Sequence, residues 1–204
     1  MPIFSVPESL RTWAEVDLGA IRANHDFVRQ RIGPSPTILA VVKANGYGHG
    51  ARETVRTLAS PKTIFGVANL HEAAEIQTVS DGNDVMLLGP CLPGERREAV
   101  RANHIVTVSS AAEAEAFSRF GTVRINFKID TGMGRIGCWS DAAISDLQSL
   151  HSVPGIEVHS ISTHLPSADE DTAFTTKQLT SFTKLARTLH EIAPTAKLHS
   201  LNSA

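Results

Sequence analysis

Short runs of hydrophobic residues alternate with amphipathic stretches along most of the chain. The first unbroken run, Ile-Leu-Ala-Val-Val at residues 38–42, is rich in branched residues and has no polar face. Such a run predicts a strand that is buried on both sides, as in a parallel sheet. Further apolar runs lie at residues 64–67, 85–88, 105–108, 123–129 and 156–161, and a last one begins at Leu198. The stretches between the runs predict helices near residues 51–59, 71–79, 95–101, 110–120, 141–150 and 175–192.

Strands that alternate with helices predict a parallel sheet with crossover helices. The seven runs from Ile38 onward therefore predict an α/β fold, a (β/α)8 barrel of the TIM type with outer helices. A complete barrel takes around 250 residues. This chain has 204 residues and ends after a strand signal, so we expect residues 1–204 to form one incomplete barrel domain of about seven strands.

Ahead of the first run, the sequence predicts two further elements. Residues 12–16 (Thr-Trp-Ala-Glu-Val) alternate in polarity as a short strand does, and Asp17 is suited to cap a helix over residues 18–31. Gly33 and the prolines that follow it would end that helix.

Composition narrows the class of protein. A net charge of -2 provides no general attraction to nucleic acid or to an anionic membrane. No apolar run approaches the roughly 20 residues of a membrane span, and the amino terminus lacks a secretion signal. Cys91 and Cys138 form no metal-binding pair, so both are predicted to be reduced, buried and unreactive. We expect a cytoplasmic, globular protein.

A lysine at the end of the first run is the main candidate for chemistry. Lys43 would lie at the carboxyl end of a buried strand, where parallel sheets bind ligands. Loss of hydration disfavours the ammonium and favours the neutral, nucleophilic amine that a Schiff base requires. Gly46, Gly48 and Gly50 would let the backbone turn tightly before the next helix. By itself, such a lysine is better interpreted as a solvated residue that ends a strand.

The residues around Lys43 change that interpretation. Val-Val-Lys-Ala-Asn-Gly-Tyr-Gly-His-Gly, residues 41–50, closely resembles the pyridoxal-phosphate lysine motif of the alanine racemase family. The resemblance implies that Lys43 holds pyridoxal 5'-phosphate as an internal aldimine and that Tyr47 lies beside the cofactor phosphate.

A second stretch, Lys-Ile-Asp-Thr-Gly-Met-Gly-Arg-Ile-Gly at residues 128–137, supports two interpretations. Gly132 to Gly137 satisfies the dinucleotide fingerprint, with Glu157 about twenty residues further on, so a nicotinamide-dependent dehydrogenase is a competing class. Two features weaken this interpretation. Asp130 and Thr131 separate the strand from the first glycine, and Glu157 precedes the apolar core of its strand.

The same stretch resembles more fully the Lys-x-Asp-Thr-Gly-Met-x-Arg-x-Gly pattern of alanine racemases. The resemblance implies that Arg135 contacts the phenolic oxygen of the cofactor and the substrate carboxylate, for which a guanidinium offers a matching planar fork. It also implies that Lys128, often carbamylated in this family, orients Arg135 by a salt bridge. The alternative is an exposed glycine-rich loop with an ordinary salt bridge.

His164 and the last residues of the chain complete the candidate site. His159 near His164 suggests a metal, but no third ligand has suitable spacing, so no metal is predicted. The family resemblance implies that His164 packs near the cofactor ring, although Leu165-Pro166 departs from the usual aromatic-small pair. It further implies that Asn202 and Ser203 lie near the cofactor, Ser203 as a phosphate ligand; the alternative is a polar tail.

Taken over all four stretches, the resemblance implies an isomerase, a homodimeric alanine racemase that interconverts L- and D-alanine for peptidoglycan synthesis. Racemisation needs two opposed acid-base groups. The resemblance implies that Lys43 is the base on the D-face of the substrate's α-carbon. It implies that the base on the L-face is a tyrosine from the carboxyl-terminal β domain of the partner subunit. That domain is absent here and the one tyrosine is Tyr47, so we expect the chain alone to be inactive. A single-domain pyridoxal-phosphate carrier is the other alternative besides the dehydrogenase.

Overall fold

The computed structural model describes residues 11–80, 82–200 and 202, and its helices and strands alternate as the sequence predicts. The strands are β1 (Ile38–Val41), β2 (Thr63–Val67), β3 (Val85–Leu87), β4 (Ile105–Val108), β5 (Val123–Asp130), β6 (Cys138–Trp139), β7 (Ile156–Ser162) and β8 (Lys197–His199). The helices are α1 (Leu18–Ile32), α2 (Lys43–Tyr47), α3 (Ala51–Leu58), α4 (Leu70–Gln77), α5 (Arg96–Arg101), α6 (Ala111–Ser118), α7 (Ala143–His151) and α8 (Thr172–Ile192). Across the described ranges, every helix is too short or too polar to span a bilayer.

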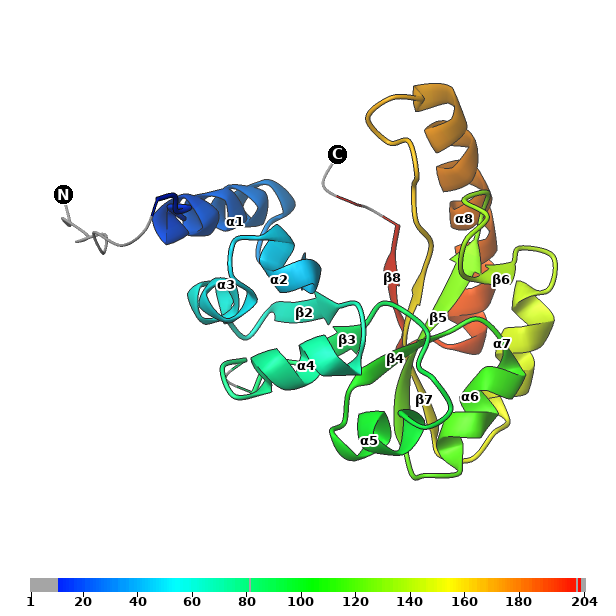
Figure 1. Ribbon diagram of the computed structural model, residues 1–204. Helices are drawn as coiled ribbons and strands as arrows, with labels where there is room; N and C mark the ends of the chain where they lie inside the picture. The colour runs from blue at the N-terminus through cyan, green and yellow to red at the C-terminus, as the bar shows by residue number, and fades with distance from the viewer. Residues whose placement is uncertain (1–10, 81, 201, 203–204) are drawn as a thin grey trace.

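The sheet is parallel and open. Its strands run in the order β1-β2-β3-β4-β5-β7-β8, and the two-residue β6 pairs with β5. Figure 1 shows the sheet curving from β2 to β8 with helices α3 to α8 around its outer side. The predicted α/β class and the seven strands of an incomplete barrel are confirmed, and β6 is an addition that the sequence did not indicate.

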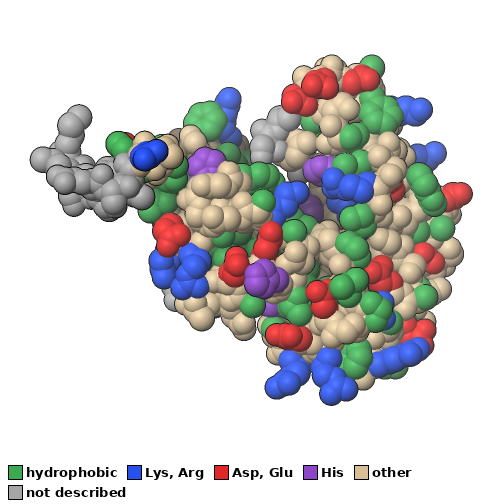
Figure 2. Space-filling view, viewed as in Figure 1, with side chains coloured by type: hydrophobic (Ala, Val, Ile, Leu, Met, Phe, Trp, Pro, Cys, Tyr) green, Lys and Arg blue, Asp and Glu red, His purple; other side chains and the backbone are tan. Residues whose placement is uncertain are grey.

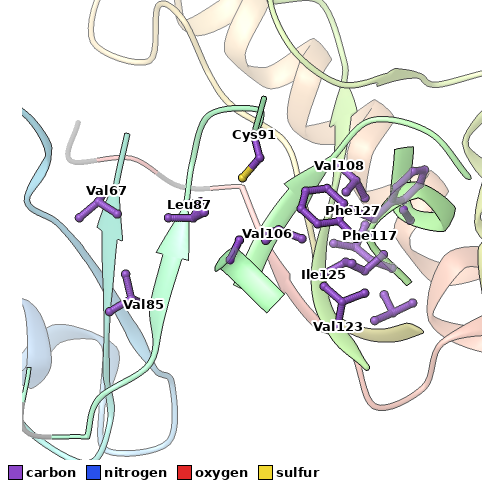
Figure 3. Packing of buried hydrophobic residues seen from close by; sticks show 14 of the residues in the cluster. Val67, Val85, Leu87, Cys91, Val106, Val108, Phe117, Val123, Ile125 and Phe127 are labelled. Carbon is purple, nitrogen blue, oxygen red and sulfur yellow. The ribbon is translucent and has the colours of Figure 1, made fainter. Parts of the chain in front are cut away.

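The main core lies between the sheet and its outer helices. On β5, Val123, Ile125, Phe127 and Ile129 all face this side and are buried. Figure 3 shows Phe117 of α6 lying against Phe127. Burying a side chain of this size contributes about 1.5–3 kcal/mol, so this layer fixes the helices against the strands that carry the site.

The inner face of the sheet is divided between apolar and polar halves. Ile64, Met86 and Ile105 form a small apolar cluster on strands β2 to β4. On β4, β5 and β7 the inner face is polar, and a hydrogen-bonded ladder crosses it. Asn126 Nδ2 donates to Thr107 Oγ1 at 3.1 Å, and Ser160 Oγ donates to Asn126 Oδ1 at 3.0 Å. This polar half extends along β5 and β7 toward their carboxyl ends, near Lys128 and His164.

The prediction that the first strand is buried on both sides is wrong. Every residue of β1 is partly exposed, and Val41 keeps 36% of its surface. In the described part of the chain β1 pairs with β2 alone, so it is an edge strand. An edge strand has no neighbour to cover its outer side.

The predicted strand over residues 12–16 is also absent. These residues have no assigned secondary structure, and the Trp13 side chain is largely exposed. Alternation gives a strand only where another strand supplies the hydrogen-bond partners. The helix after it is confirmed, because α1 begins at Leu18 and Asp17 Oδ1 accepts from the Ala20 N–H at 3.0 Å.

Both cysteines are free and buried, as predicted. Burial raises the pKa of each thiol to about 12. At neutral pH both are therefore protonated and poor nucleophiles.

Candidate functional site

Basic side chains meet at the carboxyl ends of β1, β5 and β7. Lys43 follows β1, Lys128 lies near the end of β5, and His164 follows β7. Burial, followed by the positive charges of Lys128, Arg135 and Lys43, lowers the pKa of His164. The structure thus brings Lys43, Lys128 and Arg135, three predicted site residues, within electrostatic range of a fourth, His164. Figure 2 shows Lys, Arg and His side chains gathered around a hollow on this face.

The backbone after Lys43 makes a left-handed turn. Ala44, Asn45 and Gly46 have φ/ψ of 51/51°, 53/44° and 64/37°, and Tyr47 has a φ of 54°. For residues other than glycine this conformation costs roughly 1–2 kcal/mol each. The three glycines predicted to allow a tight turn, Gly46, Gly48 and Gly50, all have positive φ. Lys43 itself is only half-buried, so the desolvation expected for its amine is partial.

Tyr47 lies next to Lys43 within this turn. The Lys43 Nζ is 5.9 Å from the centroid of the Tyr47 ring, within the range of a cation–π interaction. The ring keeps 59% of its surface exposed. The Tyr47 ring is therefore open to solvent beside the Lys43 amine.

Asp130 organises the glycine-rich loop that carries Arg135. Its Oδ1 accepts from the N–H groups of Gly132 at 2.8 Å and Met133 at 2.7 Å, and its Oδ2 accepts from the Arg135 N–H at 3.0 Å. Burial alone would raise the pKa of Asp130, but the backbone N–H donors together lower it. Asp130 was not among the site residues predicted from sequence. The signal was an aspartate directly before Thr-Gly, which is typical of side chains that bond the backbone of a following turn.

Replacing Asp130 with asparagine should destabilise this loop. The amide has one acceptor oxygen and its NH2 group would face a backbone donor, so we expect a loss of about 1–3 kcal/mol at neutral pH. Because the pKa is lower in the folded chain, the stabilisation exists above the ordinary value of 3.8 and is lost as pH falls below it. Urea unfolding of both proteins from neutral to acidic pH should show a difference that shrinks below pH 3.8. A difference independent of pH would contradict this role.

The loop does not have the geometry of a dinucleotide-binding turn. That turn requires a helix to begin at the glycines, with its N-terminus toward the pyrophosphate. Here the short strand β6 follows Gly137, and α7 begins only at Ala143. The fingerprint between Gly132 and Gly137 is therefore a coincidence of spacing.

Lys128 and Arg135 are close enough to interact electrostatically, and both side chains are positively charged. Burial first, and then the charge of Arg135, lowers the pKa of Lys128 to about 8, against an opposing effect of Asp130. Arg135 is exposed. An unmodified Lys128 therefore repels Arg135, and the predicted salt bridge between them requires a negative charge on Lys128.

The segment around His164 is tied to neighbouring elements. The Oγ1 atoms of Thr131 and Thr163 lie 2.8 Å apart, and the buried Gln178 of α8 donates to the His164 carbonyl at 3.4 Å. Asn202 Nδ2 donates to the Leu165 carbonyl at 3.0 Å, which places Asn202 beside this segment. Ser203, the expected phosphate ligand, lies outside the described residues.

His159 does not join the site. Its Nε2 lies 3.2 Å from Lys197 Nζ, and burial followed by the charge of Lys197 lowers the pKa of His159 to about 4. In the part of the chain that the structure describes, no group of three or more His, Cys, Asp or Glu side chains is arranged to hold a metal ion.

The chain is similar to alanine racemases in sequence and in fold. Residues 16–204 match the family model described as "Alanine racemase, N-terminal domain". An alanine racemase of Streptococcus equi subsp. equi is 37% identical over 198 residues, which cover 95% of this chain and 54% of the relative. A solved alanine racemase of Clostridium difficile 630 in complex with cycloserine has a TM-score of 0.89 and 26% identity, covering 97% of this chain and 57% of its own. A Bacillus anthracis alanine racemase with bound L-Ala-P has a TM-score of 0.85 and 29% identity, covering 97% and 53%. The chain spans about half the length of these relatives.

Proposed function

Because the chain belongs to the family of alanine racemase N-terminal domains, we propose that it is the cofactor-binding half of a pyridoxal-phosphate-dependent alanine racemase. The observation that supports this most directly is the convergence of Lys43, Lys128, Arg135 and His164 at one edge of the sheet. Bound pyridoxal phosphate would supply the electron sink that stabilises a carbanion at the substrate's α-carbon.

The residues present fit such a cofactor. Pyridoxal phosphate has an aldehyde, a phenolic oxygen and a phosphate, and the basic groups here complement the last two. We assign Lys43 as the residue whose amine binds the aldehyde, with Tyr47 beside the phosphate. Arg135 would bind the phenolic oxygen and the substrate carboxylate through its planar fork. His164, from the segment after β7, and Asn202, which follows β8, would line the cofactor ring, and Ser203 would bind the phosphate.

The chain's own residues account for one side of a racemisation. Moving a proton from one face of the α-carbon to the other takes two opposed groups. Lys43 is the candidate for one of them. By the family resemblance we assign the second to a tyrosine of a carboxyl-terminal domain in the partner subunit of a homodimer; the chain's single tyrosine, Tyr47, lies beside Lys43 itself. The 204-residue chain alone is then inactive, and the whole protein supplies D-alanine for peptidoglycan in the cytoplasm.

An absorbance titration tests the proposal. Added pyridoxal phosphate should give a near-visible band that disappears on borohydride reduction, whereas a nicotinamide cofactor should not bind. Failure to bind pyridoxal phosphate, together with saturable binding of the nicotinamide cofactor, would contradict the proposal. Formation of D-alanine by the longer protein would separate a racemase from a cofactor carrier.

We further propose that Lys128 is carbamylated. Its lowered pKa of about 8 leaves more neutral amine near neutral pH than an ordinary lysine has. The neutral amine attacks the carbon of CO2, an N–C bond forms as one C=O bond becomes a C–O⁻ bond, and the nitrogen releases one proton, which leaves a negatively charged carbamate in place of the neutral amine. That carbamate can pair with Arg135. Ser162 and His199, which lie opposite one another on β7 and β8, could also donate to it, because Ser162 Oγ and His199 Nε2 are buried without a hydrogen-bond partner among the described residues.

Labelled bicarbonate tests this modification. The protein in 13C-bicarbonate should show a carbamate signal by NMR that increases as pH rises toward 8, where Lys128 loses its proton. The signal should be absent from Lys128→Arg and kept in Lys62→Arg, which changes an exposed lysine. A signal of equal size in the Lys128→Arg protein would place the carbamate elsewhere.

A further inference from the structure

The left-handed turn after Lys43 needs support from outside. Ala44, Asn45 and Tyr47 are not glycines, yet all three have φ between 51° and 54°. Such conformations persist where surrounding structure holds them. Within the turn, the Gly46 N–H donates to the Val42 carbonyl at 2.8 Å, and the Gly50 N–H donates to the Asn45 carbonyl at 2.9 Å. These bonds close the turn, and Asn45 Oδ1 accepts from the Ala51 N–H at 2.9 Å, which ties the turn to the start of α3.

Glu72 of α4 attaches the other end of the turn to an element farther along the chain. Its Oε1 accepts from the Ala44 N–H at 2.9 Å, and its Oε2 accepts from the Ala68 N–H at 2.7 Å. The Ala44 N–H belongs to the peptide unit that joins Lys43 to Ala44. Fixing this peptide plane fixes the backbone on one side of Lys43, and with it the direction in which the Lys43 side chain leaves the turn. Hydrogen bonds to a carboxylate are stronger than those between neutral groups.

A second glutamate shows what Glu72 does beyond capping a helix. At the start of α4, the Glu72 N–H donates to Asn69 Oδ1 at 3.1 Å. At the start of α6, the Glu113 N–H donates to Ser110 Oγ at 3.2 Å, and Glu113 Oε2 accepts from the Ser109 N–H at 2.9 Å. Both are variants of the capping box, in which a side chain at the helix start and a glutamate three residues later each bond a backbone N–H. Glu72 differs from Glu113 because its other carboxylate oxygen binds the lysine turn.

We propose that Glu72 is a positioning residue for Lys43: it holds the Lys43–Ala44 peptide and thereby keeps the lysine amine directed toward the cofactor aldehyde. The part that concerns the cofactor rests on the proposed function. The part that concerns the turn stands on the hydrogen bonds alone. The sequence signal for Glu72 was its capping-box spacing from Asn69, but nothing in that spacing indicated a bond to a residue near Lys43.

The two glutamates provide a matched pair of variants. Glu72→Ala and Glu113→Ala remove equivalent capping carboxylates, but Glu72→Ala alone removes the acceptor of the Ala44 N–H. Amide hydrogen exchange should therefore be about tenfold faster at Ala44 in Glu72→Ala and unchanged there in Glu113→Ala. Glu72→Gln, which keeps one acceptor oxygen and the side-chain length, should restore part of the protection. Equal exchange at Ala44 in wild type and in both alanine variants would overturn the proposal.

A second measurement concerns Lys43 itself. After brief exposure to pyridoxal phosphate and borohydride, Glu72→Ala should carry about tenfold less label on Lys43 than Glu113→Ala carries. If wild type takes up no label, the proposed function fails, while the exchange experiment still decides the role of Glu72 in the turn. If wild type and both variants are labelled equally, Glu72 does not position the lysine. Should Glu72→Ala not fold, the same comparison is made between Glu72→Gln and Glu113→Gln.

Discussion

Replacing Gly137 with alanine should destabilise the chain by about 3 kcal/mol or more, whereas Gly134→Ala in the same loop should cost about 1 kcal/mol. A Cβ on Gly137 would lie 2.6 Å from the Asp130 nitrogen and 2.8 Å from the Ile129 carbonyl carbon. Both atoms belong to the backbone of β5, which the buried core holds in place. Gly137 also has a φ of 141°, a backbone conformation that residues with a side chain rarely adopt.

Gly134 is the matched control for this substitution. Its φ of 71° is also positive, but a Cβ there would meet nothing within 4 Å. The comparison therefore measures what the clash with β5 and the rarer φ of Gly137 add to the milder left-handed strain at Gly134. Urea unfolding of the two variants and wild type would measure it. Equal transition midpoints for the two variants would contradict the close approach of Gly137 to β5.

Replacing Lys43 with arginine should abolish covalent capture of pyridoxal phosphate. Arginine keeps the positive charge and much of the side-chain length, but its guanidinium stays protonated and cannot attack the aldehyde. We expect the near-visible band and the borohydride-stable label on this peptide to be lost completely. Because the charge is kept, a weakened electrostatic attraction for the phosphate cannot explain the loss.

Lys62→Arg is the control for Lys43→Arg. Lys62 is exposed, and its Nζ donates to the Ser35 carbonyl at 3.1 Å, away from the site. This variant should keep the band at wild-type strength. An unchanged band in Lys43→Arg would show that another lysine binds the cofactor.

Most of the fold could be predicted because its signals are local. Each strand of the sheet path from β1 to β8 coincides with an apolar run, and Asp17 marks the start of α1 as a capping residue should. The errors concern properties that depend on distant partners. The Thr-Trp-Ala-Glu-Val alternation has no strand beside it, and the exposure of β1 depends on what covers the sheet edge.

The candidate site likewise has residues that local motifs predict and residues whose role depends on partners elsewhere in the chain. Lys43, Lys128, Arg135 and His164 could be selected from motifs, and parallel topology explains why the ends of their strands meet at one edge. Asp130 and Glu72 were missed because their role is to bind backbone N–H groups. For Glu72 that group is on Ala44, in a different element and 28 residues away, so no local pattern contains it.

The central claim is that position, and not nucleophilicity alone, selects the lysine that binds the cofactor. Lys128, in protein freed of CO2 so that its amine is unmodified, is the informative competitor, because burial and Arg135 lower its pKa to about 8 and so favour its reactive neutral form. The decisive measurement is peptide mapping by mass spectrometry after pyridoxal phosphate and borohydride treatment of the wild-type chain. We predict that the pyridoxyl group lies on Lys43. Label mainly on Lys128, or spread over exposed lysines, would contradict the account.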